Sequence, residues 1–266
     1  MNKTAILIPH YNNPEGLVRS LGSIHYEERA DVFIVDDGSN TLLIDEDAVR
    51  LSFKASGSIT FIYLGENKGI ETALNTGLSA ITATQKYTYI ARLDSDDQCI
   101  GNRFFIQEQY MDTHPDIMLL GCNAHAVDSD GNTLYDLIFP ETNGQIKKKM
   151  HVNSMFLHPG VIIRASVLSQ VGLYPLGYPA AEDYALFFKI VKHYKAENLQ
   201  QFLVKYEINP SGISATRRKK QVQSRLRIMA DNFYFGFYPV YGILRSLLLY
   251  VMPTGLILAI KKKLSK

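Results

Sequence analysis

Residues 87–97 read YTYIARLDSDD, an apolar stretch followed by three carboxylates in four positions. The first part, Tyr87–Leu93, has the aromatic and β-branched residues of a buried strand. Carboxylates this close raise one another's proton affinity unless a cation compensates their charge, so Asp94, Asp96 and Asp97 favour a cation site at the strand end. A solvated acidic turn explains the same run equally well when it is taken alone. The rest of the chain decides between the two.

Three more strand-like runs precede residue 87, and segments with helical spacing separate them. This alternation predicts βαβ units and a parallel sheet in a Rossmann-like, nucleotide-binding layer. Ligands of such sheets bind beyond the carboxyl ends of the strands, which is where polar residues follow three of the runs. The predicted strands are Thr4–Pro9, Val32–Asp36, Ile59–Leu64 and Tyr87–Leu93, and the predicted helices are Glu15–His25, Asp45–Lys54 and Ile70–Thr84.

After residue 100 the pattern changes. We expect one α/β domain over residues 1–216, with its halves meeting at about residue 100, and a basic, apolar helical tail over residues 217–266. The predicted elements of the second half are a helix over Arg103–Thr113, a strand over Ile117–Cys122, a hairpin at Asp128–Asn132, a strand over Val161–Arg164 and a helix from Glu182 to about Lys195.

Length and composition exclude a disordered or fibrous chain, since 266 residues with 46% hydrophobic content can bury one substantial core. The two cysteines, Cys99 and Cys122, form neither a disulfide framework nor a paired metal-ligand spacing, so they indicate free thiols in a reducing compartment. The apolar run Ala5–Ile8 lacks the length of a secretory signal. We therefore expect a cytoplasmic protein.

Charge is distributed unevenly along the chain. From Arg217 onward there are eleven basic residues and one acid, Asp231, which leaves 17 of the 28 basic and 25 of the 26 acidic residues in the first 216 positions. A basic tail on an acidic body suits an anionic surface. Because no nucleic-acid recognition module accompanies the tail, nucleic acid is not an expected partner.

The longest uncharged stretch of the tail, Ser246–Ile260, falls short of the ~20 residues that a spanning helix needs. Tyrosines interrupt the apolar residues, and Lys261–Lys263 follow them. These features favour helices that lie at a membrane interface. Packing onto the domain or onto a partner subunit in a homo-oligomer, and a true span, are the alternatives.

Two further acidic motifs have plausible chemistry. An aspartate after a strand, as in Val35-Asp36-Asp37-Gly38-Ser39, can accept a hydrogen bond from the imide of uracil or thymine, although an ordinary Asp-Gly turn has the same sequence. Glu182-Asp183 at a helix start can supply a general base, or simply cap the helix. Mn²⁺ or Mg²⁺, which prefer oxygen ligands and often bind one or two carboxylates plus substrate phosphates, suit the acidic run.

Six short motifs occur in a fixed order between residue 4 and about residue 230. Each is a weak signal alone, and their order and spacing are specific together. They are Ile8-Pro9-His10-Tyr11-Asn12; Val35-Asp36-Asp37-Gly38-Ser39; Asn67-Lys68-Gly69 with Ala73, Asn75 and Gly77; Arg92-Leu93-Asp94-Ser95-Asp96-Asp97; His158-Pro159; and Glu182-Asp183.

This ordered set resembles family 2 glycosyltransferases of the GT-A fold, in which a Rossmann-like mixed sheet is flanked by helices. The resemblance implies an inverting transfer of a sugar from a nucleotide-sugar donor, with residues 1–100 as the donor half and residues 101–216 as the acceptor half. It implies that Tyr11 stacks on the base, that Asp37 reads its imide, and that Asp94 and Asp96 bind ribose and metal, with Asp97 as a possible second metal ligand. The donor side also includes Pro9, Asn12 and Asn67.

The resemblance further identifies Asp183 as the catalytic base, with Glu182 as its acidic neighbour. Arg92 is expected to approach the phosphates or to form a structural salt bridge, and His158 to line the acceptor side or the diphosphate. Many relatives carry serine or threonine after the His-Pro pair, whereas this chain has Gly160. The expected donor is a UDP- or dTDP-sugar and the expected acceptor a glycan or lipid-linked glycan, on the inner face of the cell membrane.

Three other functions are compatible with parts of the pattern. A sugar-1-phosphate nucleotidyltransferase would carry a glycine-rich basic loop after the first strand, where this chain has His10-Tyr11-Asn12-Asn13-Pro14. A receiver-type signalling domain would need a phosphoacceptor aspartate and a lysine at the ends of later strands. This chain is also about twice as long as such a domain. A catalytically degenerate subunit that only binds the donor differs from an enzyme in chemistry rather than in sequence pattern.

Overall fold

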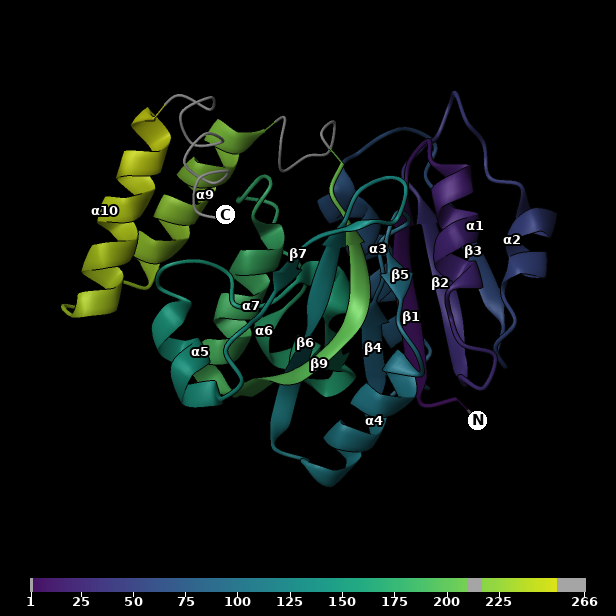
Figure 1. Cartoon of the computed structure of the whole chain (residues 1–266), viewed down its shortest axis with the longest axis horizontal. Coiled ribbons are helices and arrows are strands. Elements are labelled where there is room, and N and C mark those ends of the chain that lie inside the picture. The colour runs from purple at the N-terminus through teal and green to yellow at the C-terminus, as the bar shows by residue number, and fades with distance from the viewer. Residues whose placement is uncertain (1, 210–216, 253–266) are drawn as a thin grey trace.

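The computed structural model describes residues 2–209 and 217–252. Within them, one mixed sheet of nine strands has the order β3-β2-β1-β4-β8-β6-β9-β5, with β7 paired to β6 (Figure 1). The sheet runs through the whole molecule, and helices cover both of its faces.

The first half forms parallel βαβ units, as the sequence predicts. Both faces of β1 are covered: Ala5 and Leu7 lie in one hydrophobic cluster with α3, while Ile6 and Ile8 lie in another with α1. A strand covered on both sides must be apolar throughout, and all seven residues of β1 and of β2 are buried. The elements are β1 (Thr4–His10), α1 (Pro14–Gly22), β2 (Ala30–Asp36), α2 (Glu46–Ser52), β3 (Ile59–Tyr63), α3 (Ile70–Ala83) and β4 (Tyr89–Arg92).

The second half mixes strand directions. β8 pairs antiparallel with both β4 and β6, and β9 pairs parallel with β6. The predicted hairpin is present as β6 and β7, whereas β9, the longest strand among the described residues, is not among the elements predicted from the sequence. The elements are β5 (Gln98–Cys99), α4 (Arg103–Thr113), β6 (Ile117–Val127), β7 (Thr133–Leu137), α5 (Asn143–Lys149), η1 (His158–Gly160), β8 (Ile162–Arg164), η2 (Ala165–Val167), α6 (Leu168–Val171), α7 (Glu182–His193) and β9 (Lys195–Glu207).

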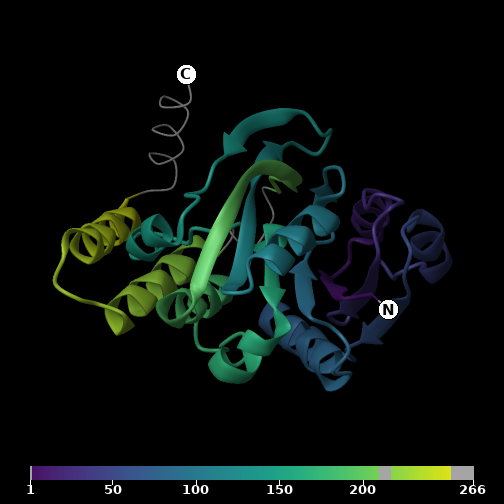
Figure 2. The same ribbon diagram turned by 90° about the horizontal axis from the view of Figure 1, so that it is seen from below.

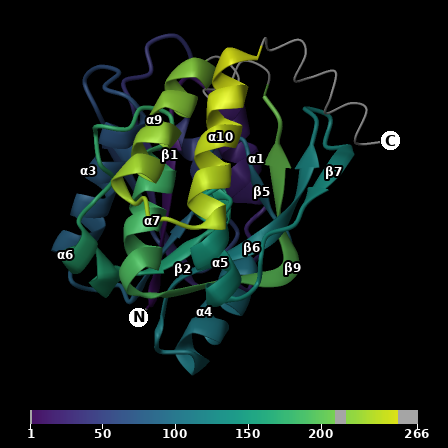
Figure 3. The same ribbon diagram turned by 90° about the vertical axis from the view of Figure 1, so that its left-hand side faces the viewer.

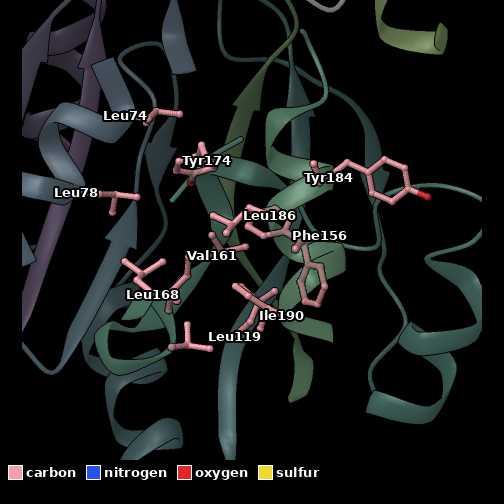
Figure 4. Packing of buried hydrophobic residues seen from close by; sticks show 14 of the residues in the cluster. Leu74, Leu78, Leu119, Phe156, Val161, Leu168, Tyr174, Tyr184, Leu186 and Ile190 are labelled. Carbon is pink, nitrogen blue, oxygen red and sulfur yellow. The ribbon is translucent and has the colours of Figure 1, made fainter. Parts of the chain in front are cut away.

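A single large cluster joins the halves. α3 and α7 meet on the same face of the sheet and share this cluster, as Figure 4 shows for Leu74 and Leu78 from α3 and for Leu186 and Ile190 from α7. The cysteines Cys99 and Cys122 are both free and buried, as expected from the sequence.

The described part of the tail is a pair of helices, α9 (Arg218–Asp231) and α10 (Phe237–Val251), which lie side by side at one end of the molecule (Figures 1 and 3). α9 adds Ile228 and Met229 to the main cluster. None of the helices in residues 2–209 and 217–252 is long and apolar enough to cross a membrane. The rest of the predicted tail, residues 253–266, lies outside the described residues, and the boundary at residue 216 stays a prediction.

Candidate functional site

The carboxyl ends of β1, β2 and β4 meet at one edge of the sheet, the upper edge in Figure 1. His10 at the end of β1 is buried beside Asp36 at the end of β2, with 2.7 Å between His10 Nδ1 and Asp36 Oδ2. Because the Asn13 N–H donates to His10 Nε2 at 3.1 Å, the ring proton lies on Nδ1 and points at the Asp36 carboxylate. This pair fixes the two loops that carry Tyr11 and Asp37.

Asp37 organises the loop between β3 and α3. Its Oδ1 accepts the Lys68 N–H at 2.8 Å and its Oδ2 accepts the Gly69 N–H at 3.0 Å. Gly38 has φ +70°, and a Cβ there would lie 2.3 Å from the backbone of Glu66, so only glycine allows this approach. Burial raises the pKa of Asp37. Each oxygen keeps a second lone pair, so the expected imide contact stays a prediction.

The other donor-side residues lie around the same edge. Asn12 has φ +48°, and its Oδ1 accepts the backbone N–H groups of residues 40, 41 and 42 at 3.1–3.2 Å. Tyr11, next to it, is 45% exposed and available for stacking. Pro9 is buried within β1, and Asn67 is exposed in the loop before α3. Asn12 therefore shapes the loop that presents Tyr11.

Arg92 connects the acidic run to the sheet. Its side chain is 1% exposed; Nη1 donates to the Leu7 carbonyl at 2.5 Å and Nη2 donates to Asp94 Oδ1 at 2.5 Å. The structural salt bridge considered from the sequence is thus present. Its partner Asp94 keeps 24% of its side chain exposed, so Arg92 orients a carboxylate that still faces the edge.

Asp96 and Asp97 differ in their surroundings. Asp97 is fully buried, and its Oδ1 accepts the N–H of Glu207 at the end of β9 at 2.9 Å. Its Oδ2 is buried and has no hydrogen-bond partner among the described residues. Burial raises the pKa of Asp97 well above its usual range, and the charges of Asp96 and Asp94 add to this. Burial and then Asp94 raise the pKa of Asp96 to about 7.

These carboxylates fit a divalent cation only in part. Among residues 2–209 and 217–252, no group of three or more acidic, histidine or cysteine side chains could hold a metal ion by itself. Mg²⁺ and similar ions commonly take one or two carboxylates plus substrate phosphates. Asp96, with its raised proton affinity, and the unpartnered Oδ2 of Asp97 fit a cation that takes its remaining ligands from a bound phosphate compound.

Glu182 and Asp183 occupy the first turn of α7. Glu182 is 6% exposed, and its buried Oε2 has no hydrogen-bond partner among the described residues. Burial and then the charge of Asp183 raise the pKa of Glu182 to about 8. The pKa of Asp183 is raised by burial, against the opposing effects of the Tyr184 N–H and Arg225. The charge of Asp94 raises the pKa of both, which indicates that α7 presents its acids to the same space as the acidic run.

His158 lies between these two groups of acids. Its Nε2 is 2.8 Å from the Tyr174 hydroxyl and 3.4 Å from Arg92 Nε. Burial and the charge of Arg92 hold the pKa of His158 well below its usual range, so the imidazole is neutral and accepts from both donors. Asn75 fixes Tyr174 through two hydrogen bonds to its backbone, at 2.8 and 2.9 Å.

Sequence reasoning missed three contributors to the site: Tyr174, Glu207 and Ser20. The Ser20 hydroxyl donates to the carbonyls of Asp97 and Asp94 at 2.6 and 3.0 Å and so holds the turn of the acidic run. Each acts through a backbone group or through another side chain, so a motif of its own does not mark it.

Relatives were found by sequence. The profile of Glycosyl transferase family 2 matches residues 5–172. The amylovoran biosynthesis glycosyltransferase AmsE of Erwinia amylovora is 27% identical over 229 residues, covering 84% of this chain and 83% of the relative. An O-antigen biosynthesis glycosyltransferase of Escherichia coli, WbnJ, is 28% identical over 151 residues, covering 56% and 57% of the two chains.

Solved structures share the fold. S. aureus TarS 1-349 in complex with UDP-GlcNAc superposes with a TM-score of 0.65 at 16% identity, covering 94% of this chain and 72% of that one. The mannosyltransferase PcManGT of Pyrobaculum calidifontis, in complex with GDP-Man and Mn2+, gives a TM-score of 0.62 at 16% identity, covering 94% and 70%. The profile covers more than half of the chain and ends in the second half of the sheet, beyond the acidic run and the His-Pro element. The chain therefore belongs to glycosyl transferase family 2.

Proposed function

We propose that this glycosyltransferase is an inverting enzyme that moves a hexose-type sugar from a UDP- or dTDP-sugar to a hydroxyl of a growing surface glycan, such as lipopolysaccharide, lipooligosaccharide or capsule. The observation that carries the proposal is a chain of contacts between two acidic groups, Asp94–Asp97 at the sheet edge and Glu182–Asp183 on α7. Arg92 contacts both Asp94 and His158, and the His158 ring lies 5.8 Å from the ring of Phe187 on α7. The names of the relatives, in amylovoran and O-antigen biosynthesis, support the acceptor class.

On the donor side, Tyr11 offers an exposed ring for stacking on the base and Asp37 offers its remaining lone pairs to the imide. Asp94, oriented by Arg92, is placed to accept from a ribose hydroxyl. Asp96 would hold Mn²⁺ or Mg²⁺, with Asp97 as the second candidate ligand. The bound cation would stabilise the negative charge of the departing diphosphate. Structures of relatives contain UDP-GlcNAc in one case and GDP-Man with Mn2+ in another.

On the acceptor side, Asp183 takes the proton of the attacking hydroxyl. The hydroxyl oxygen bonds to the anomeric carbon while the bond from that carbon to the diphosphate breaks in line, which inverts the configuration. Burial raises the pKa of Asp183, and a base gains effectiveness as its pKa approaches the working pH. The neutral His158 and its partner Tyr174 line the space between donor and base.

The base assignment predicts a specific loss in Asp183→Asn. The amide keeps the shape but cannot take a proton, so transfer should fall about 10²- to 10⁴-fold while the affinity for the nucleotide sugar changes little. Transfer is measured with radiolabelled donor, and donor binding by calorimetry. Asp47→Asn, the same change at an exposed helix start, should leave both unchanged. Robust transfer by Asp183→Asn would sink the assignment.

Two alternatives have distinct signatures. A degenerate subunit would bind a nucleotide sugar yet show neither transfer nor slow donor hydrolysis, with or without Asp183. A sugar-1-phosphate nucleotidyltransferase would release pyrophosphate from a nucleoside triphosphate. A panel of UDP-, dTDP- and GDP-sugars tested for slow hydrolysis separates these and identifies the donor.

We also propose that the acceptor is a lipid-linked glycan and that the enzyme works in the cytoplasm on the inner face of the cell membrane, as a monomer or homo-oligomer. The basic charge of the tail and the two helices at its start support this placement.

A further inference from the structure

The outer face of α10 is a continuous apolar surface. Its exposed large apolar side chains recur every three or four positions, which places them on one side of a helix. Phe237 is 74% exposed and Val251 at the other end is also 74% exposed. The opposite side packs on the molecule so closely that a Cβ on Gly242 would lie 1.9 Å from the His151 carbonyl oxygen. The exposed positions are Phe237, Val240, Tyr241, Leu244, Leu247, Leu248 and Val251.

The turn between α9 and α10, residues 232–236, contains Phe233, Tyr234 and Phe235 and is called the aromatic turn below; it extends this surface. Phe235 is 94% exposed, and Tyr234 beside it is half-exposed. Contiguous apolar surface of this kind marks an interaction site, whereas single exposed apolar residues are ordinary.

A pocket of about 360 Å³ opens beside the aromatic turn. Lys147 from α5 and Lys192 from α7 line it, together with His151 and Tyr234. The His151 ring meets Phe188 and Tyr234 edge-on, at 5.0 and 4.9 Å, and its buried Nδ1 has no hydrogen-bond partner among the described residues. The pocket thus joins two ammonium groups and an unused imidazole nitrogen to an aromatic wall.

One acid, Asp231, also lines the pocket and accepts a hydrogen bond. The Tyr178 hydroxyl donates to Asp231 Oδ2 at 2.7 Å. The hydroxyl leaves the Asp231 charge in place, so Lys147 and Lys192 (+2) with Asp231 (−1) give the pocket lining a net charge of +1. The surroundings are therefore suited to an anion.

We propose that α10, the aromatic turn and this pocket form a docking surface for an anionic phospholipid bilayer, with the apolar side chains at the acyl boundary and a lipid phosphate between Lys147 and Lys192. A second copy of the chain is a poorer occupant. A twofold interface brings the same surface of both copies together, so Lys147 and Lys192 of one copy would repel those of the other. An apolar partner would leave the two ammonium charges without an anion; the contact of Lys192 Nζ, 3.5 Å from Asn232 Oδ1, is to a neutral amide. A helix lying in the interface plane needs apolar residues on one side only, which is the pattern of α10.

This proposal rests on the proposed function in one respect: the lipid-linked acceptor is taken to lie in the membrane to which the docking surface binds. α9 connects the docking surface to the candidate base: its Ser224 hydroxyl donates to the Pro179 carbonyl at 2.9 Å, four residues before Asp183. A bilayer under α10 would thus lie one helix away from the acceptor side of the site.

The test uses the full chain and co-sedimentation with phosphatidylcholine vesicles, with and without phosphatidylglycerol. The wild type should bind the anionic vesicles. Lys147→Glu/Lys192→Glu should weaken this binding at least about tenfold, because each basic residue near an anionic surface contributes to attraction. Phe235→Ser/Phe237→Ser should weaken it to a similar extent. The matched controls are Arg29→Glu/Lys54→Glu and Tyr26→Ser/Leu51→Ser, exposed residues of the donor half at the other end of the molecule (Figure 2).

Absence of wild-type binding to anionic vesicles, or unchanged binding after reversal of the two lysines, overturns the proposal. So does a dimer in sedimentation velocity that Phe235→Ser/Phe237→Ser dissociates, since the surface would then be an interface between copies. Slow donor hydrolysis, measured in parallel without vesicles, should be equal in all variants. Its absence from the wild type would count against the proposed function while leaving the docking result intact.

Discussion

Arg92 shows how one buried side chain sets the geometry of the candidate site. Three of its nitrogens reach groups from different parts of the chain: the Leu7 carbonyl, Asp94 and His158. The planar guanidinium offers donors in fixed directions, which a lysine cannot reproduce. Its position in the sequence, just before the acidic run, left a phosphate contact and a salt bridge equally open. The structure contains the salt bridge to Asp94, and the phosphate contact stays a prediction.

If Asp96 holds the cation as proposed, cation binding should depend on pH. Burial and Asp94 raise the pKa of Asp96 to about 7, so protons compete with a metal ion below that pH. Mn²⁺ affinity should therefore fall about tenfold per pH unit below about pH 7. Calorimetry in the presence of a UDP-hexose, whose diphosphate diester keeps its charge over this range, measures the effect. Asp96→Asn should bind Mn²⁺ more weakly and with a shallower pH dependence, and chelation should abolish wild-type transfer. A pH-independent wild-type affinity would contradict this.

How far single residues can be predicted from the sequence depends on how they act. Asp94 and Asp183 could be predicted because their motifs occur in order with the other motifs, whereas the local pattern of each fits an acidic turn or a helix cap equally well; their roles stay predictions. Tyr174 could not be found, since its hydroxyl reaches His158 only after Asn75, 99 positions away, has fixed its backbone. Asn12 was predicted on the donor side, and the structure shows it bonding three loop N–H groups.

At the scale of elements, α4 has an N-terminus that is capped from a distance. Glu28, 2% exposed, accepts the N–H groups of Phe104 and Phe105 at 2.8 and 2.9 Å. These are orphan donors of the first helical turn, and a carboxylate there also meets the helix dipole favourably. Glu28→Ala should lower the free energy of unfolding by about 2 kcal/mol, because one buried and one partly buried N–H group lose their acceptor. Urea denaturation measures it.

The effect of Glu28 should also depend on pH. Burial raises the pKa of Glu28 to about 7, above the unfolded value of 4.5. Between about pH 4.5 and pH 7 the folded state therefore holds a proton on Glu28 that the unfolded state has lost. Its contribution to stability is therefore full below about pH 4.5 and is lost as the pH rises through about 7. The difference between wild type and Glu28→Ala should be larger at about pH 5 than at about pH 8. Glu27→Ala, the exposed neighbour, should show neither effect.

Which elements could be predicted follows from the same physics. β1 and β2 are apolar on both faces, and α1 and α3 carry one apolar side, so period and composition located them to within a few residues. β9 was missed because its burial is irregular: bulges shift its register against β6 near Cys122 and Asn123. A strand whose pairing partner lies far back in the chain and whose alternation is broken has little local signature.

At the scale of the whole molecule, the described tail helices differ in how they attach. Ile228 and Met229 of α9 are buried in the main cluster with α3 and α7 residues, whereas α10 packs on the molecule through Pro239, Gly242 and Ser246 and adds only the partly buried Ile243 to that cluster. Packing of α9 on the main cluster thus contributes to the stability of the domain, whereas α10 forms the outer layer. Sequence alone grouped both as one tail, because neither charge nor hydropathy distinguishes a helix that joins a core from one that covers it.

This arrangement predicts that α9 unfolds together with the domain. Met229 is fully buried, so Met229→Ala should cost about 2–5 kcal/mol through lost burial and a cavity. Leu244→Ala on the exposed face of α10, where the side chain is 61% exposed, should cost little and serves as the matched control. If α9 belongs to the same cooperative unit, Met229→Ala shifts one urea transition followed both by far-UV circular dichroism and by loss of UDP-sugar binding. A separate early transition, with the binding midpoint unchanged, would show instead that the chain unfolds in two parts and that residue 216 is a true boundary.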